Sequence, residues 1–426
     1  MAHKPPPPTH EEMLSHQPSL VMALIGLVSL RRTLPLIARR TRAPLMLLWL
    51  GVLVTILLVG LAVFRLDTPQ WLQAFLLSET PAAEVLAPVQ AEAEEAHWWQ
   101  VYFTLGADGG CLEADSMADE QAVTRALVSQ IEQAQESIYI AAFSFDLESV
   151  ALALMDAARR GVEVVFITDD LYGLADDEIK YPQAPYFERL AQAGVQVQTD
   201  GGTGLMHNKF IIFDRSAVWT GSLNLTRNGV CRNNNNALLI HSEALADLYL
   251  NEFEEMRHHE FGAASPSTLE QQTVYIDGHG VRVFFAPEDQ VLANLAPIIA
   301  LSQQEVLFMA YSFTTHGLCD EMVALHQRGV TVRGVFESRG SSVDHSCLND
   351  LLASGAEVRQ DGNPAAMHHK VIILDRRYVI TGSFNFSNSA DQRNDENLIM
   401  IDDPALAQLF IDELELRWSV AQEPAQ

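Results

Sequence analysis

Basic residues are scarce in this chain of 426 residues, which has 27 Lys and Arg against 55 Asp and Glu and a formal net charge of −28. The imbalance lies beyond residue 66, because residues 1–66 hold seven basic residues and two acidic ones. An acidic body repels a polyanion at long range and releases few counterions on binding one. The composition therefore argues against a broad nucleic-acid surface. It leaves room for a local basic cleft, and solubility alone would also explain the charge.

Cysteine is rare as well, and Cys111, Cys231, Cys319 and Cys347 lack the paired spacing of a zinc site. One or two disulfides could form, in any of three connectivities, if the body lies in an oxidising compartment. Buried free thiols are the alternative. The sequence predicts no metal site and no cofactor.

Charged residues are missing from residues 43–64, which read APLMLLWLGVLVTILLVGLAVF. A helix of that length, rising 1.5 Å per residue, crosses a hydrocarbon core of about 30 Å. A signal peptide is the alternative, but its apolar region has roughly 7–15 residues behind a short basic start. We therefore expect a transmembrane helix over 43–64.

The two flanks of this segment differ in charge. Five arginines lie between residues 31 and 42, which favours a cytoplasmic N-terminal segment over residues 1–42. Residues 65–97 become rich in Ala, Glu and Pro, a composition typical of a tether. The large body is then expected on the outer, exoplasmic side of the membrane.

Beyond the tether the chain divides into two similar halves, predicted over residues 98–262 and 279–420. Each half begins with an apolar run, ESIYIAAFSF at 136–145 and QEVLFMAYSF at 304–313, followed by a helical pattern and a second apolar run. Helices alternating with buried strands predict an α/β lobe with helices on a largely parallel sheet. The first half carries seven extra residues within 171–187, which could form the rim of a site or a simple loop.

The halves also share a polar pattern, since residues 206–225 and 367–386 are identical at twelve of twenty positions with a constant offset of 161. A packed core needs periodic apolar residues, but it does not need polar residues at fixed places. The polar residues repeated are His207, Lys209, Asp214, Ser222 and Asn224, and then His368, Lys370, Asp375, Ser383 and Asn385.

Alternation along a strand would place His207 and Lys209 on one face, and His368 rather than His369 beside Lys370. If the halves face each other, two imidazoles, two ammonium groups and two Asn amides surround one pocket. Such a pocket suits a phosphodiester: Lys, Ser and Asn hold its oxygens, one His attacks phosphorus, and the other protonates the leaving oxygen.

The doubled pattern H-x-K-x4-D-x6-G-S-x-N resembles the signature of the phospholipase D superfamily, and the resemblance covers roughly residues 98–420. It implies two α/β lobes related by a pseudo-twofold, one active site at their interface, a phosphohistidine intermediate and no metal. It also implies that His207 is the nucleophile. Within the catalytic motif, Asp214 and Asp375 would support the structure rather than touch the phosphate.

One position departs from the family pattern, in which an acidic residue after the motif often hydrogen-bonds the catalytic His. The second half supplies Glu396, but the matching residue of the first half is Asn235. An anionic partner raises imidazole basicity, whereas a neutral amide can only orient the ring. The two histidines should therefore differ, and His368 becomes an alternative nucleophile.

Lipases, phosphatidyl transferases and nucleases share this motif, so the motif does not identify the substrate. The apolar segment and the acidic body favour a membrane-anchored phospholipase D that releases phosphatidic acid and a headgroup alcohol. The alternatives are a metal-independent endonuclease, a phosphatidyl transferase of the cardiolipin synthase kind, and a phosphoanion-binding module without turnover. The endonuclease would use Arg227, Arg232, Arg376, Arg377 and Arg393 as its basic groove. The sequence leaves the oligomeric state open.

Overall fold

The computed structural model describes residues 97–106, 121–180, 182, 185–202, 204–266 and 272–424. The cytoplasmic segment expected over 1–42, the transmembrane helix expected over 43–64 and the tether expected over 65–97, except its last residue, lie outside these residues, as does Cys111. Within the described ranges, no helix combines the length and the apolar character needed to cross a bilayer.

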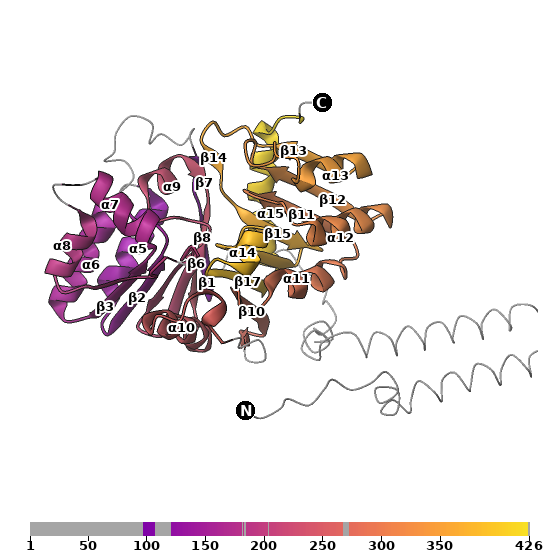
Figure 1. The fold of residues 1–426 in the computed structure, drawn as a ribbon. Helices are drawn as coiled ribbons and strands as arrows, with labels where there is room; N and C mark the ends of the chain where they lie inside the picture. The colour runs from indigo at the N-terminus through magenta and orange to yellow at the C-terminus, as the bar shows by residue number, and fades with distance from the viewer. Residues whose placement is uncertain are drawn as a thin grey trace, which may run out of the picture. The chain divides into compact units, whose positions relative to one another are not determined.

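Two lobes built on one plan make up the described chain, the first in indigo to magenta and the second in orange to yellow in Figure 1. The first contains β1 (Trp99–Phe103), α5 (Ala122–Gln133), β2 (Ser137–Ala142), α6 (Glu148–Arg160), β3 (Glu163–Thr168), the π-helical turn η3 (Asp170–Leu174), α7 (Ala175–Lys180), α8 (Tyr186–Gln192), β4 (Gln196–Thr199), β5 (Lys209–Phe213), β6 (Ala217–Gly221), α9 (Arg227–Cys231), β7 (Asn233–Asn234), β8 (Asn236–His241), α10 (Glu243–Arg257) and η4 (Gly262–Ala264).

The second lobe contains β9 (Thr273–Ile276), β10 (His279–Ala286), α11 (Val291–Ile299), β11 (Glu305–Ala310), α12 (His316–Gln327), β12 (Thr331–Phe336), α13 (Cys347–Ser354), β13 (Glu357–Gln360), β14 (Ala366–Met367), β15 (Lys370–Leu374), β16 (Tyr378–Gly382), α14 (Asn388–Gln392), β17 (Glu396–Asp402) and α15 (Pro404–Val420). Its sheet includes β9, so this lobe begins before residue 279.

The strand orders of the two main sheets correspond. In the described residues the first sheet runs β1-β8-β6-β5-β2-β3-β4, and the second repeats this order as β10-β17-β16-β15-β11-β12-β13 with β9 added at the β10 edge. The expectation of two similar α/β lobes is therefore confirmed. Apolar runs such as SIYIAA of β2 are buried along their whole length, because Ile138 and Ile140 pack in the outer cluster while Tyr139 and Ala141 pack in the inner one.

The expectation of a largely parallel sheet is wrong, since both sheets are mixed. Among the described strands of these two sheets, parallel pairing is limited to β2, β3 and β4 and to β11, β12 and β13. The motif strand β5 lies antiparallel to both of its neighbours, β2 and β6. A connection of three residues joins β5 to β6, which is too short for the crossover that a parallel pair requires.

The core has an inner and an outer layer. In the first lobe, α5, α6 and α8 pack on the outer face of the sheet through residues such as Leu127, Leu154 and Leu190. The inner layer is one cluster that includes Phe253 of α10, Phe410 of α15 and strand residues from both sheets. The two lobes therefore share a hydrophobic core, and this core supports the motif strands that leave it.

The turn after each motif strand is held by the motif aspartate. Asp214 and Arg215 have φ of 48° and 50°, the left-handed values of the tight turn that suits a hairpin. The Oδ1 atom of Asp214 accepts hydrogen bonds from the backbone amides of Glu136 at 2.7 Å and Ser137 at 2.9 Å. Asp375 repeats this in the second lobe, accepting from the amides of residues 303–305.

We expect Asp214→Ala to lower the free energy of unfolding by about 1–2 kcal/mol, because the amides before β2 lose their acceptor and Ala is strained at positive φ. Denaturant unfolding followed by circular dichroism measures this change. Asp247→Ala is the matched control, since Asp247 forms an exposed ion pair with Arg215 at 3.3 Å. That pair should contribute about 0.5 kcal/mol or less. Equal losses in the two variants would contradict the role given to Asp214.

Candidate active site

Each motif begins by hydrogen bonding to the other lobe. The His207 amide donates to the Asp395 carbonyl at 2.9 Å, and Met206 forms a parallel bridge with Asp395. In the reciprocal contact, the His368 amide donates to the Asn234 carbonyl at 2.8 Å, beside the pairing of β14 with β7. These contacts are what an approximate twofold would produce. They bring the starts of β5 and β15 to the interface of the lobes.

Both predicted histidines line one cavity of about 330 Å³ at this interface. His207 and His368 are each 7% exposed. The ring of Phe143 packs edge-on against His207 at 4.7 Å, and Tyr311 packs against His368 in the same way at 4.5 Å. The imidazoles are therefore buried, backed by aromatic rings, and available to one ligand.

The carboxylate of Glu396 holds His207. Its Oε2 atom lies 2.7 Å from Nδ1 of His207 and accepts from the Ser383 hydroxyl at 2.6 Å. A carboxylate only accepts, so we assign the ring proton to Nδ1. No described residue hydrogen-bonds Nε2 of this ring, which leaves its lone pair for chemistry in the cavity.

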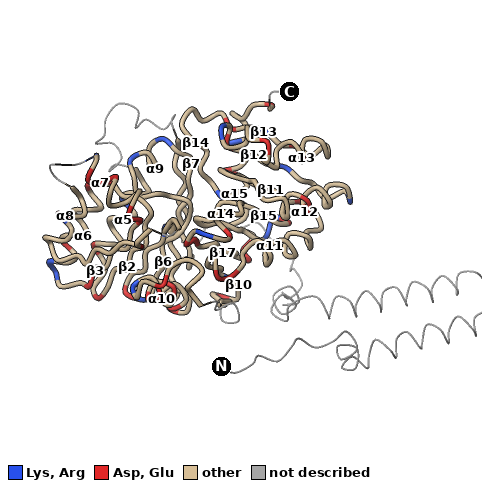
Figure 2. Tube along the Cα trace, viewed as in Figure 1, with Lys and Arg blue, Asp and Glu red and all other residues tan. Residues whose placement is uncertain are grey.

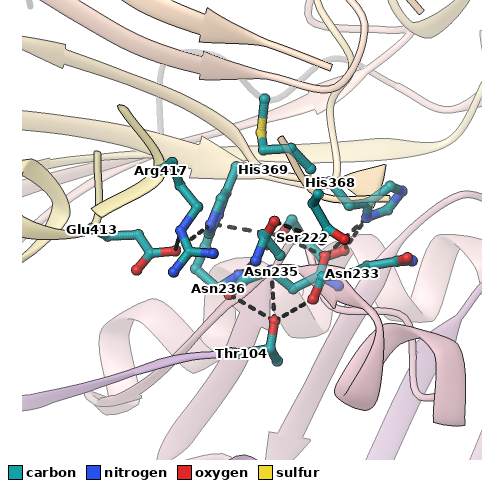
Figure 3. A network of polar contacts seen from close by, with 12 residues as sticks. Thr104, Ser222, Asn233, Asn235, Asn236, His368, His369, Glu413 and Arg417 are labelled. Atoms are coloured by element: carbon teal, nitrogen blue, oxygen red, sulfur yellow. Dashed lines mark hydrogen bonds and ion pairs between the residues drawn. The ribbon is translucent and has the colours of Figure 1, made fainter. Parts of the chain in front are cut away.

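An amide holds His368 in the corresponding way (Figure 3). Oδ1 of Asn235 lies 2.9 Å from Nδ1 of His368 and accepts from the Ser222 hydroxyl, while Nδ2 of Asn235 donates to the Gly229 carbonyl. The bond to Gly229 fixes the amide so that its oxygen faces the ring. Nδ1 of His368 therefore also carries the proton, and Nε2 is the atom left for chemistry.

These partners are exchanged between the lobes, which the sequence reasoning did not foresee. It associated Glu396 with the histidine of its own half and so weakened the case for His207. The structure instead gives the carboxylate to His207, because Glu396 follows Asp395, the residue that bridges to Met206. The two histidines do differ in their partners, but the anionic partner binds His207 and the neutral amide binds His368.

Burial governs the charge of this site. It lowers the pKa of His207 to about 4, although the Glu396 carboxylate acts in the opposite direction. Burial also lowers the pKa of His368 well below its usual value, and the nearby ammonium groups of Lys370 and Lys209 add to the effect. Both imidazoles are therefore neutral near pH 7 in the unliganded protein.

The two lysines are buried beside the histidines. Nζ of Lys209 donates to the His207 carbonyl at 2.6 Å, and Nζ of Lys370 donates to the His368 carbonyl at 2.9 Å. Burial lowers the pKa of Lys209 to about 7, and burial together with Lys209 lowers that of Lys370. A bound anion would raise both values, so the pair is suited to an oxyanion.

The other predicted phosphate ligands divide into two groups. Asn224 lines the cavity, and Oδ1 of Asn224 and of Asn385 are buried without a hydrogen-bond partner in the described structure. An amide with an unpaired buried end is suited to a ligand, since rotation presents either its oxygen or its NH2. Ser222 and Ser383 instead bind Asn235 and Glu396, so their hydroxyls support the residues that orient the histidines.

A second set of polar contacts joins the lobes behind the histidines, and Figure 3 shows the part of it around Asn236 and His369. His369 faces away from the cavity, as alternation predicts, and binds Nδ2 of Asn236 at 3.0 Å and Oε1 of Glu413 at 3.1 Å. On the other side Asn397 accepts from Thr220 at 2.7 Å and donates to Asn208 at 2.9 Å. Asn236 and Asn397 directly follow the two residues that orient the rings of His207 and His368. Sequence reasoning missed both, although their equivalent places in the two halves were a signal.

The extra residues of the first half form part of the cavity wall. Tyr172, Asp176 and Lys180, from η3 and α7, line the cavity together with Asp146 and Asn228. A second cavity of about 620 Å³ lies between α7, α8 and β4, and it contains neither histidine. Of the two alternatives for the extra residues, the rim of a site therefore fits this segment better than a simple loop.

Two further predictions concern cysteine and metal. Cys319 and Cys347 form a disulfide between α12 and α13, and Cys231 is disulfide-bonded too. No described cysteine is free, so the alternative of buried thiols is wrong for these three. The described residues contain no group of three or more His, Cys, Asp or Glu placed to hold a metal ion.

Comparison with known proteins gives a family match over both lobes. A family model described as "Cardiolipin synthase, PLD-like domain" matches residues 127–257 and 295–418, more than half of the chain. Human mitochondrial cardiolipin hydrolase is 33% identical over 130 residues, which are 30% of this chain and 52% of that protein. A phospholipase D of Rickettsia felis is 34% identical over 131 residues, 31% of this chain and 66% of that protein.

The match to these curated relatives thus spans about half to two thirds of their length. Among solved structures, the phosphatidylserine synthase of Haemophilus influenzae shares the fold, with a TM-score of 0.55. It is 14% identical, and the match covers 76% of this chain and 87% of that one.

The His207–Glu396 contact predicts an unusual titration. The ring of His207 should protonate near pH 4, and Glu396→Gln should lower its pKa further, because the variant loses the negative charge that favours the imidazolium ion. NMR of 13C-labelled histidine, assigned with His207→Asn, measures both values. Glu413→Gln is the control, since Glu413 binds His369 and should leave the His207 titration unchanged. A His207 pKa that does not change in Glu396→Gln would show that the contact does not form as described.

Proposed function

The chain belongs to the phospholipase D superfamily, and we propose that it is a membrane-anchored phospholipase D that hydrolyses a glycerophospholipid to phosphatidic acid and a headgroup alcohol. The observation that carries this proposal is the pair of buried imidazoles lining one cavity, each held through Nδ1 with Nε2 left for reaction. A module that only bound phosphate would need the lysines but not two histidines in this arrangement.

In the proposed reaction, Nε2 of His207 attacks phosphorus, and the bond from phosphorus to the headgroup oxygen breaks. His368, protonated at Nε2, gives its proton to that oxygen. Water then gives a proton to His368 and attacks phosphorus, so that the phosphorus–nitrogen bond breaks and phosphatidic acid leaves. The substrate phosphate raises the pKa of His368 from its lowered value, which allows the ring to act first as an acid.

Glu396 supports His207 as the nucleophile. When Nε2 bonds to phosphorus, the ring becomes cationic, and the carboxylate on Nδ1 stabilises that charge. Nδ1 of His368 faces two neutral acceptors, the amide oxygen of Asn235 and the carbonyl of Ser222, which suit a group that exchanges a proton with each half-reaction. The lysines and the amides of Asn224 and Asn385 would hold the nonbridging oxygens.

A phospholipid is favoured over nucleic acid for three reasons. Residues 43–64 have the length and composition of a membrane anchor. Acidic positions recur over both lobes (Figure 2), which disfavours a polyanion. The Cys319–Cys347 disulfide suits a body in an oxidising compartment, on the outer side of the membrane.

The decisive measurement is headgroup release by the full-length protein in phosphatidylcholine and phosphatidylethanolamine vesicles containing EDTA. We expect choline or ethanolamine to appear with phosphatidic acid, and the rate to fall by about a thousandfold or more in His207→Asn and in His368→Asn. Protein that stays with the vesicles after an alkaline carbonate wash would support the anchor. No release from lipid, together with cleavage of DNA or RNA in EDTA, would replace this proposal with a nuclease.

Assignment of the nucleophile can be tested with a phosphatidyl ester of p-nitrophenol, whose leaving group needs no proton. We expect His368→Asn to release a rapid burst of one nitrophenolate per protein and then stop, because the phosphohistidine forms but no base activates water. His207→Asn should show no burst. The reverse pattern would make His368 the nucleophile, and no burst in either variant would exclude a covalent intermediate.

A further inference from the structure

We propose that residues 170–180, named here the rim segment, form the surface on which the protein docks to a phospholipid bilayer with neutral headgroups. The inference rests on the proposed function and identifies the partner of the same site. The rim segment consists of η3 and α7, and it follows β3 directly. It belongs to the region in which the first half carries its seven extra residues.

One row of side chains on the rim segment lines the cavity that contains His207 and His368. Tyr172, Asp176 and Lys180 lie four residues apart, the spacing that aligns side chains along a helix, and all three line the cavity. Tyr172 packs on Phe143 at 5.1 Å, and Phe143 packs on His207 at 4.7 Å. This row is therefore continuous with the proposed nucleophile.

The neighbouring row of the rim segment is apolar and exposed. Leu171 is 60% exposed and Ile179 is 76% exposed, and Tyr172 beside them keeps 46% of its surface exposed. Gly173 and Asp177 form the buried side of the same segment, so Leu171 and Ile179 point away from the protein's own core. Exposed large apolar side chains at the mouth of a site are typical of an interaction surface.

The proposed substrate implies that the partner of this surface is a bilayer. A glycerophospholipid keeps its acyl chains in the membrane while its phosphate reaches the histidines, so the mouth of the cavity must meet the bilayer surface. Leu, Tyr and Ile can then enter the boundary between headgroups and acyl chains. The second lobe offers no equivalent wall, because residues 337–346 after β12 contain no helix. Docking would therefore be through the first lobe.

The charge of the rim segment favours a bilayer of zwitterionic lipids over an anionic one. Asp170, Asp176, Asp177 and Glu178 accompany a single cation, Lys180, in the rim segment, and Figure 2 shows acidic positions on α7. Lys180 is itself paired with Asp176 at 2.7 Å. Such a surface is repelled by an anionic membrane. It suits zwitterionic lipids whose outermost group is an ammonium ion.

The first test compares substrates with the full-length protein. Leu171→Ser combined with Ile179→Ser should reduce hydrolysis of phosphatidylcholine in vesicles by about tenfold, since apolar burial at the interface is lost. Hydrolysis of monomeric dihexanoylphosphatidylcholine should stay within about twofold, because neither residue lines the cavity. Leu152→Ser combined with Tyr275→Ser is the matched control, removing residues 46% and 57% exposed elsewhere. Equal loss on both substrates, or no loss on vesicles, would overturn the proposal.

The second test needs no activity, so it separates docking from catalysis. A bimane label attached through Ile179→Cys should be quenched by nitroxide-labelled phosphatidylcholine when the full-length protein is reconstituted in zwitterionic vesicles. A label attached through Leu152→Cys should be quenched much less. Equal quenching at the two positions would overturn the docking surface. Strong quenching at position 179 from a protein that hydrolyses no lipid would support docking while rejecting the proposed function.

Discussion

The site depends on one constraint: the imidazole of each motif histidine is oriented by a residue from the opposite lobe. Glu396 of the second lobe binds Nδ1 of His207, and Asn235 of the first lobe binds Nδ1 of His368. Backbone contacts to Asp395 and Asn234 fix the chain at the same two places. Neither lobe therefore contains a complete half of the site. The distance between the two rings is set by how the lobes dock, and the shared apolar core and the contacts of Asn236 and Asn397 hold that docking.

Burial also sets the protonation states of the two histidines and lowers the pKa of the two lysines. Water is largely excluded from two imidazoles and two ammonium groups, so the charged forms are disfavoured and the rings stay neutral. A phosphodiester in the proposed reaction would reverse this balance, because its negative charge favours protonated lysines and a protonated His368. Substrate binding would thus bring its own electrostatic field to a site that is held nearly uncharged without it. The arrangement needs few fixed charges, which is compatible with an acidic protein.

Much of the fold could be read from the sequence, because buried strands and helix stops leave periodic signals in each half. The repeat predicted two lobes, and polar identity within it located the histidines, lysines and asparagines of the motif. The alternation of helices and strands favours a parallel sheet, whereas the three-residue connection between β5 and β6 requires an antiparallel pair. The partner exchange of Glu396 and Asn235 could not be derived, since the position of a residue within its own half does not indicate which lobe its side chain faces. Tyr172, Asp176 and Lys180 line the cavity because the chain forms a π-helical turn after β3, and no sequence pattern predicts that turn.

The covalent link between the lobes has a consequence for how this active centre could diverge. In a symmetric homodimer of a single lobe, any substitution appears on both sides of the twofold at once. Here the two copies mutate independently, so a carboxylate can be kept where one imidazole needs it while an amide replaces it on the other side. The same freedom permits an added wall on one lobe alone. A single chain that carries both lobes can therefore give its two imidazoles different partners and different surroundings.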